Sequence, residues 1–142
     1  MTDMMRNAQH AAILRPAEIV PHERGGGART VPLVTGGIGS TSLLNGITEF
    51  APGGAIPLHT HNCEESVMVL EGEAICEIDG TQHRLKAQDK TWLPPNLPHR
   101  FINASDTQEM KIFWIYADVN ATRTMIETGE TRPIAAEHAK RL

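Results

Sequence analysis

Short apolar runs separated by glycine and proline are the feature that most limits the folds open to this chain. The 12 glycines and 9 prolines among its 142 residues fall between these runs and do not end long helical patterns. Runs with strand character occupy residues 42–50, 66–70, 73–78, 82–85, 91–94, 99–103 and 110–119. No helical pattern of roughly 10 to 15 residues separates them, which disfavours parallel βαβ units. We therefore predict an all-β fold, an antiparallel sandwich or barrel.

The residues around Asp79 and Gly80 predict a β-hairpin. Residues 73–78 alternate in polarity before this dipeptide, and a second short run follows at residues 82–85. Aspartate followed by glycine suits the positive φ angles of a tight two-residue turn. At the other end of the chain, residues 133–142 form the only plausible helix.

The length indicates one domain, long enough to bury about two-thirds of its unfolded surface. We interpret residues 1–35 as an N-terminal arm with one strand, because this segment is polar and shows little periodicity. Residues 36–119 form the predicted barrel, and residues 120–142 form a partly helical C-terminal extension.

Composition and charge disfavour several classes of partner. The formal net charge is -4 and the basic residues are scattered, so no surface for a nucleic-acid backbone is expected. The sequence contains no apolar run of about 18 residues, so no membrane span is expected. The first residues lack the apolar block of a secretory leader. A cytoplasmic location is therefore expected. The two cysteines are too few for a disulfide scaffold.

A group of histidines and a glutamate predicts a metal site. His59 and His61 are two residues apart, so on a strand both side chains project from one face, and Glu65 shares their parity. Glu64 is the alternative carboxylate and faces the other side. His99 begins another strand, and an antiparallel return can bring it opposite the first pair. Three imidazoles and a carboxylate suit iron, manganese, nickel, copper or zinc better than calcium or magnesium.

The spacing of these residues resembles the two motifs of the cupin superfamily. The first motif, G-x5-H-x-H-x3-E-x6-G, is matched at Gly53, His59, His61, Glu65 and Gly72. The second motif, G-x5-P-x-G-x2-H-x3-N, is matched at Pro94, His99 and Asn103, whereas Gln88 and Asn96 stand at its two glycine positions. The likeness covers residues 40–118 and is typical of a small single-domain cupin. Asparagine also tolerates the left-handed conformation that a turn requires at the second of these positions.

The resemblance implies a small antiparallel jelly roll that holds one divalent transition-metal ion on His59, His61, Glu65 and His99. It also implies a homodimer in which the N-terminal arm exchanges a strand. A mononuclear enzyme acting on a small molecule is expected, with dioxygenase chemistry first if the metal is iron. A metal-dependent isomerase, cyclase or lyase is the alternative, as is a cupin that binds a small ligand without catalysis. Glu65 is the candidate base.

Three aromatic side chains are candidates for the wall of a substrate pocket. Phe101 shares the parity of His99, and Trp114 and Tyr116 share one face of their strand. For each of them, packing in the core is the competing interpretation. Val67 and Val69 continue the face of Glu65 and predict an apolar lining.

Overall fold

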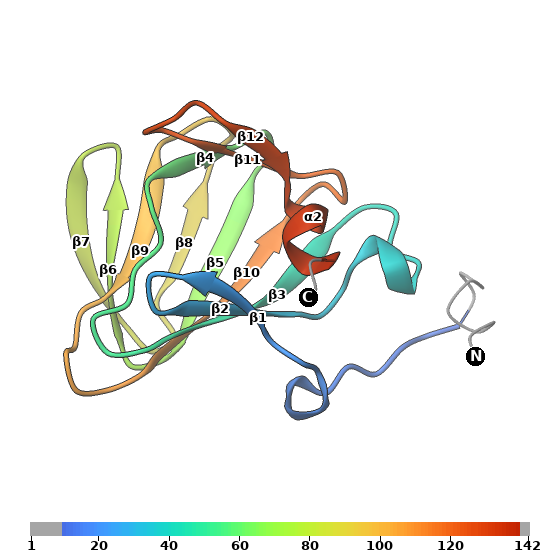
Figure 1. Cartoon of the computed structure of the whole chain (residues 1–142), viewed down its shortest axis with the longest axis horizontal. Helices are drawn as coiled ribbons and strands as arrows, with labels where there is room; N and C mark the ends of the chain where they lie inside the picture. The colour runs from blue at the N-terminus through green and yellow to red at the C-terminus, as the bar shows by residue number, and fades with distance from the viewer. Residues whose placement is uncertain (1–9, 140–142) are drawn as a thin grey trace.

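The computed structural model describes residues 10–139, which form two six-stranded antiparallel sheets (Figure 1). The first sheet has the strand order β1 (His22–Gly25), β2 (Ala28–Pro32), β3 (Leu44–Phe50), β10 (Met110–Tyr116), β5 (Glu65–Glu71), β8 (Lys90–Leu93). The second has the order β12 (Thr131–Pro133), β11 (Thr122–Met125), β4 (His59–His61), β9 (His99–Asn103), β6 (Glu73–Ile78), β7 (Thr81–Lys86). Helix α2 (Ile134–Ala139) follows β12. The predicted all-β jelly roll with a short C-terminal helix is confirmed.

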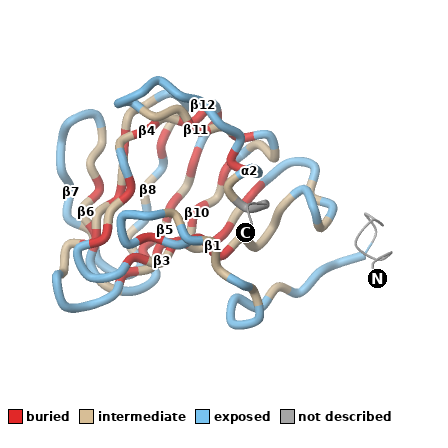
Figure 2. The backbone as a smooth tube through the Cα atoms, in the orientation of Figure 1, coloured by how far each residue is buried: buried red, intermediate tan, exposed pale blue. Residues whose placement is uncertain are grey.

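The core lies between the two sheets, because the central strands alternate strictly between buried and partly exposed residues. Strands β3 and β10 have the same alternating burial and pair along their full length. The expected inward positions Val67 and Val69 on β5 are both fully buried. Figure 2 shows these buried stretches on the strands of the sheets, with exposed chain concentrated in the connections.

The hairpin predicted at Asp79 and Gly80 joins β6 to β7. The φ angles of these two residues are 49° and 88°. Both are positive, as the predicted tight turn requires. Six residues of β6 pair with six of β7 in unbroken register.

The two positions where the second cupin motif has glycine adopt the same backbone conformation without it. Gln88 has a φ of 79° and Asn96 a φ of 66°. Each turn is held by a backbone hydrogen bond: the Gln88 N–H donates to Val69 O at 2.7 Å, and the Asn96 N–H donates to His61 O at 2.8 Å. The departures from the motif therefore change the residue and preserve the turn, at the cost of placing a residue with a side chain in the left-handed backbone conformation.

Both ends of the described chain contribute strands to the sheets. The sequence indicated one strand in the N-terminal arm, whereas β1 and β2 form a hairpin and β2 pairs with β3. In the C-terminal extension, β11 pairs with β4, so the extension lies beside the strand that carries His59 and His61. Short 3-10 turns occupy Pro16–Glu18 and Gly36–Ile38. Within residues 10–139, no helix has the length and apolar character needed to cross a membrane.

Candidate metal centre

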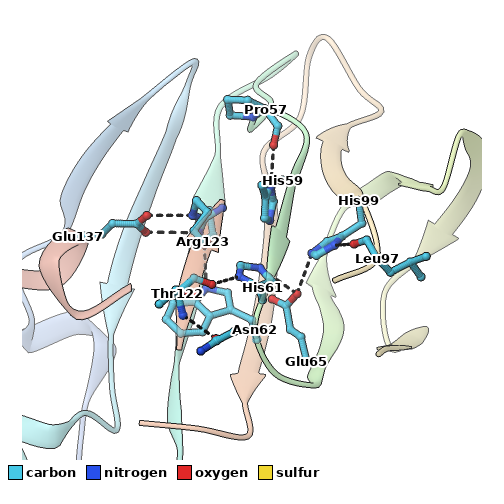
Figure 3. Close-up of polar contacts among 12 residues, drawn as sticks. Pro57, His59, His61, Asn62, Glu65, Leu97, His99, Thr122, Arg123 and Glu137 are labelled. Carbon is cyan, nitrogen blue, oxygen red and sulfur yellow. Dashed lines mark hydrogen bonds and ion pairs between the residues drawn. The ribbon is translucent and has the colours of Figure 1, made fainter. Parts of the chain in front are cut away.

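Three buried histidines converge between the sheets (Figure 3). His59 and His61 project from the same face of β4, and His99 on β9 is the register partner of His59. The ring centroids lie 4.5 Å apart for His59 and His99, 4.7 Å for His59 and His61, and 5.1 Å for His61 and His99. One nitrogen from each ring lies within 4.8 Å of the others, close enough to hold one metal ion. The antiparallel return predicted for His99 is thus present.

Hydrogen bonds to the backbone fix the tautomer of each ring. Every Nδ1 lies beside a carbonyl oxygen, which only accepts, so each Nδ1 carries a proton. In His59 and His61 this leaves Nε2 with a lone pair, whereas His99 Nε2 is hydrogen-bonded to Glu65 Oε1 at 2.9 Å. The three acceptors are Pro57 O for His59 at 2.7 Å, Thr122 O for His61 at 3.0 Å and Leu97 O for His99 at 2.8 Å. His61 Nε2 is buried and has no hydrogen-bond partner in the described structure. Such a buried, unpaired acceptor beside two other imidazoles fits a metal ligand.

Glu65, and not Glu64, lies with the histidines. Glu65 Oε1 is 2.9 Å from His99 Nε2 and 3.5 Å from His61 Nε2, and the side chain is buried. Glu64 instead accepts a hydrogen bond from Trp92 Nε1 at 2.8 Å on the outer surface. The carboxylate oxygen is therefore positioned either as a fourth ligand or as a base beside the ion.

Burial sets the protonation of this cluster. It lowers the pKa of His61 to about 4 and that of His59 well below 6.5, with the charge of Arg123 acting in the same direction. Burial alone raises the pKa of Glu65, but His61 and His99 outweigh it and leave that pKa lowered. The neutral rings of His59 and His61, together with His99 and the ionised Glu65 carboxylate, form a donor set that suits a divalent transition metal.

Of the three aromatic candidates, Tyr116 lies against the histidines. The Tyr116 ring centroid is 4.6 Å from that of His61, and Tyr116 is the register partner of Glu65. Burial raises the Tyr116 pKa well above 10, which keeps the phenol protonated. Trp114 packs on Tyr116 and donates its Nε1–H to Thr48 Oγ1 at 2.8 Å, while Phe101 is buried in the core cluster.

Sequence reasoning missed an ion pair next to the histidines, between the buried Arg123 and the part-buried Glu137. Arg123 on β11 is the register partner of His61, and its Nε and Nη2 donate to the Glu137 carboxylate of α2 at 2.9 and 3.4 Å. No motif in the C-terminal extension marks these residues. The one available signal is that Thr122–Met125 reads as a possible short strand, whose partner the sequence does not reveal.

Comparison with known proteins settles the family. The family model described as "Cupin domain" matches residues 46–116, half of the 142 residues. The chain belongs to the cupin family. This cupin is 33% identical over 97 residues to the polyketide synthase CurC of Streptomyces cyaneus, spanning 68% of this chain and 63% of CurC. It is 30% identical over 131 residues to protein SchB of Streptomyces halstedii, spanning 88% of this chain and 94% of SchB.

A solved relative confirms the architecture. The polyketide cyclase RemF from Streptomyces resistomycificus superimposes with a TM-score of 0.71 over 88% of this cupin and 86% of RemF. The two sequences are 17% identical, so the likeness is one of fold. The cupin fold and a cluster of three histidines able to hold a metal ion are therefore both present in this chain.

Proposed function

We propose that this cupin is a mononuclear metalloenzyme that catalyses ring closure in small poly-β-ketone compounds. His59, His61 and His99 hold one divalent ion, and Glu65 serves as fourth ligand or as base. The observation that carries the proposal is the convergence of three imidazoles whose Nδ1 atoms all donate to backbone carbonyls. Within residues 10–139, His61 Nε2 is buried and has no hydrogen-bond partner.

The choice of ring closure rests on the relatives. CurC is a polyketide synthase protein, and RemF is a polyketide cyclase with the same fold. Poly-β-ketones carry pairs of carbonyl oxygens separated by one acidic methylene carbon. A divalent ion held at this centre would act as a Lewis acid toward such oxygens.

The side chains around the centre can carry out the rest of an aldol closure. Glu65 is ionised and buried beside His99 and His61, where it can accept the proton that a methylene group loses. The resulting carbon nucleophile attacks a ketone of the same molecule, forming a carbon–carbon bond and breaking the C=O π bond, and the ketone oxygen takes back the proton from Glu65 to become a hydroxyl group. Loss of this hydroxyl group as water, together with a ring hydrogen, then allows the closed ring to become aromatic. Tyr116, whose ring centroid lies 4.6 Å from that of His61, provides a buried apolar wall that excludes water beside the centre.

Dioxygenase chemistry, the first expectation from the sequence, remains an alternative that the same protein sample tests. It consumes O2 and is expected first of all with iron, whereas ring closure by aldol chemistry consumes no O2. Zinc-loaded or nickel-loaded protein that cyclises its substrate without O2 uptake supports the proposal. Uptake of O2 by iron-loaded protein that depends on a diketone or diol contradicts it.

Cyclisation of a synthetic linear tetraketone, followed by the ultraviolet absorbance of the aromatic product, tests the proposal. Wild-type protein loaded with zinc, manganese or nickel is compared with Glu65→Gln and with Glu64→Gln. Glu64 adjoins Glu65 but lies on the outer surface, so its variant is the matched control. The proposal expects accelerated closure that Glu65→Gln loses and Glu64→Gln keeps. No acceleration with any of the three metals refutes it.

A further inference from the structure

A cavity of about 590 Å³ lies directly beside the histidine cluster. Its wall includes Arg123 and Met125, which are the β11 register partners of His61 and His59. Pro57 also lines it, and the carbonyl oxygen of Pro57 orients the His59 ring. The cavity therefore adjoins the proposed metal centre through β11 and Pro57, and its described lining residues include none of the three histidines.

Arg123 stands between this cavity and the histidines with part of its hydrogen-bonding capacity unused. Its Nε and Nη2 form one edge of the planar guanidinium and donate to Glu137. Nη1 lies at the other edge, is buried, and has no hydrogen-bond partner among the residues that the structure describes. The side chain is 8% exposed. Figure 3 shows Arg123 between Glu137 on one side and His59 on the other.

The charges around the cavity favour an anionic ligand. Glu137 is shared by Arg123 and by Arg24, whose Nη2 lies 3.7 Å away. The cavity wall also carries Arg132, Glu23 and Glu130, so with the buried Glu65 three arginines face four glutamates before any ion is bound. A divalent cation on the histidines therefore leaves the region with net positive charge, which an anionic oxygen would compensate.

We infer that Arg123, through Nη1, binds an anionic oxygen, a carboxylate or an enolate, of the ligand that reaches the metal centre through this cavity. The inference rests on the proposed function, because it concerns the substrate of the same centre. Guanidinium and carboxylate or enolate groups form charge-assisted hydrogen bonds, which are stronger than neutral ones. Arg123 is thereby a substrate-binding residue, and Glu137 sets its orientation.

Calorimetric binding of matched probes to zinc-loaded protein tests the inference. Salicylate carries a carboxylate, salicylamide is its neutral analogue of the same shape, and acetylacetone supplies an enolate. Arg123→Gln removes the charge, Arg123→Lys keeps it without the planar fork, and Glu137→Gln frees Arg123 from its partner. Arg84→Gln is the control, since Arg84 is an exposed arginine paired with Glu73 on the hairpin of β6 and β7.

Wild-type protein is expected to prefer salicylate to salicylamide, and Arg123→Gln is expected to weaken salicylate about 10- to 100-fold while leaving salicylamide unchanged. Arg123→Lys retains part of the preference, and Arg84→Gln retains all of it. Glu137→Gln binds salicylate at least as tightly as wild type. If acetylacetone alone responds to Arg123, the anionic oxygen is an enolate; if salicylate alone responds, it is a carboxylate.

A purely structural Arg123 gives a different pattern. In that case Arg123→Gln and Glu137→Gln would have the same effect on binding. Both variants would weaken the binding of salicylate and salicylamide alike, or neither would change it, and that result overturns the inference. If Arg123→Gln does not fold, weaker salicylate binding by folded Glu137→Gln overturns it instead. If wild-type protein takes up no zinc, the proposed function fails. The inference is then decided by the metal-free protein: it stands if wild type prefers salicylate to salicylamide and Arg123→Gln loses that preference, and it falls if either result is absent.

Discussion

Acidification of the metal-free protein should destabilise it through His61, and replacing His61 by asparagine should remove that effect. The pKa of His61 is lowered from the ordinary 6.5 to about 4, chiefly by burial. As the pH falls, the unfolded chain therefore takes up this proton before the folded chain does. Stability due to the neutral ring is complete above pH 6.5 and is lost as the pH falls from 6.5 toward 4.

The expected size of the effect follows from these two pKa values. The unfolded imidazole is mostly protonated below its pKa of 6.5, whereas the folded ring stays neutral down to about pH 4. Between pH 7 and pH 5 the two states therefore differ in protonation over roughly 1.5 pH units, from 6.5 to 5. At 1.36 kcal/mol per unit this lowers the free energy of unfolding by about 2 kcal/mol. His59, whose pKa is lowered in the same direction, adds to the loss in wild-type protein. Zinc should oppose it, since it binds the neutral rings.

Urea unfolding at pH 7, 6 and 5 with a chelator present, followed by tryptophan fluorescence, measures this difference. Asparagine can keep the hydrogen bond to Thr122 O that His61 Nδ1 makes, so His61→Asn removes the titration with little change in packing. The variant should lose about 2 kcal/mol less than wild type between pH 7 and pH 5. His83→Asn, on the exposed face of β7, should follow the wild type. Equal losses in wild type and His61→Asn would refute the reasoning.

Three further predictions concern the backbone, a thiol and the assembly. Gln88→Gly should raise the free energy of unfolding by up to about 1 kcal/mol, because glycine adopts the left-handed φ of this position without strain. Gly72→Ala should lower the free energy of unfolding by roughly 1–3 kcal/mol, because a Cβ there would lie 2.5 Å from Glu109 O. Urea titrations measure both changes, and changes of the opposite sign would refute the argument. Burial raises the pKa of Cys76 to about 12, so iodoacetamide should label this thiol only in denaturant. Mass spectrometry of the labelled peptides measures this, and rapid labelling of Cys76 in the native protein would contradict the prediction. The homodimer expected from the cupin resemblance remains a prediction that sedimentation equilibrium measures, with a monomer mass at micromolar concentration as the contrary result.

The central strands and the histidine cluster could be predicted because local patterns and the spacing of the cupin motifs specify them. Alternating polarity predicts the inward face of a strand wherever one face is buried, and the same parity placed Glu65 inside and Glu64 outside. The pairing of His59 with His99 required only an antiparallel return between two recognisable strands. The hairpin at Asp79 followed from turn chemistry alone.

The surroundings of the cluster depend on long-range pairing that no local pattern encodes. Thr122–Met125 is a short strand, and nothing within it indicates that it pairs with β4. The placement of Arg123 against His61, and of Glu137 on Arg123, follows from that pairing and from the position of α2. Arginine side chains are usually exposed, so the burial of Arg123 was not expected from the sequence.

The metal content of the purified protein tests the central claim most directly. Protein prepared without an affinity tag that binds metal, and then loaded with zinc, is analysed for metal by mass spectrometry alongside His61→Ala and His99→Ala, with circular dichroism to confirm that each is folded. The account predicts one ion per wild-type chain and a large loss in both folded variants, because each removes an Nε2 from the cluster. Full retention of the ion in both variants would contradict it.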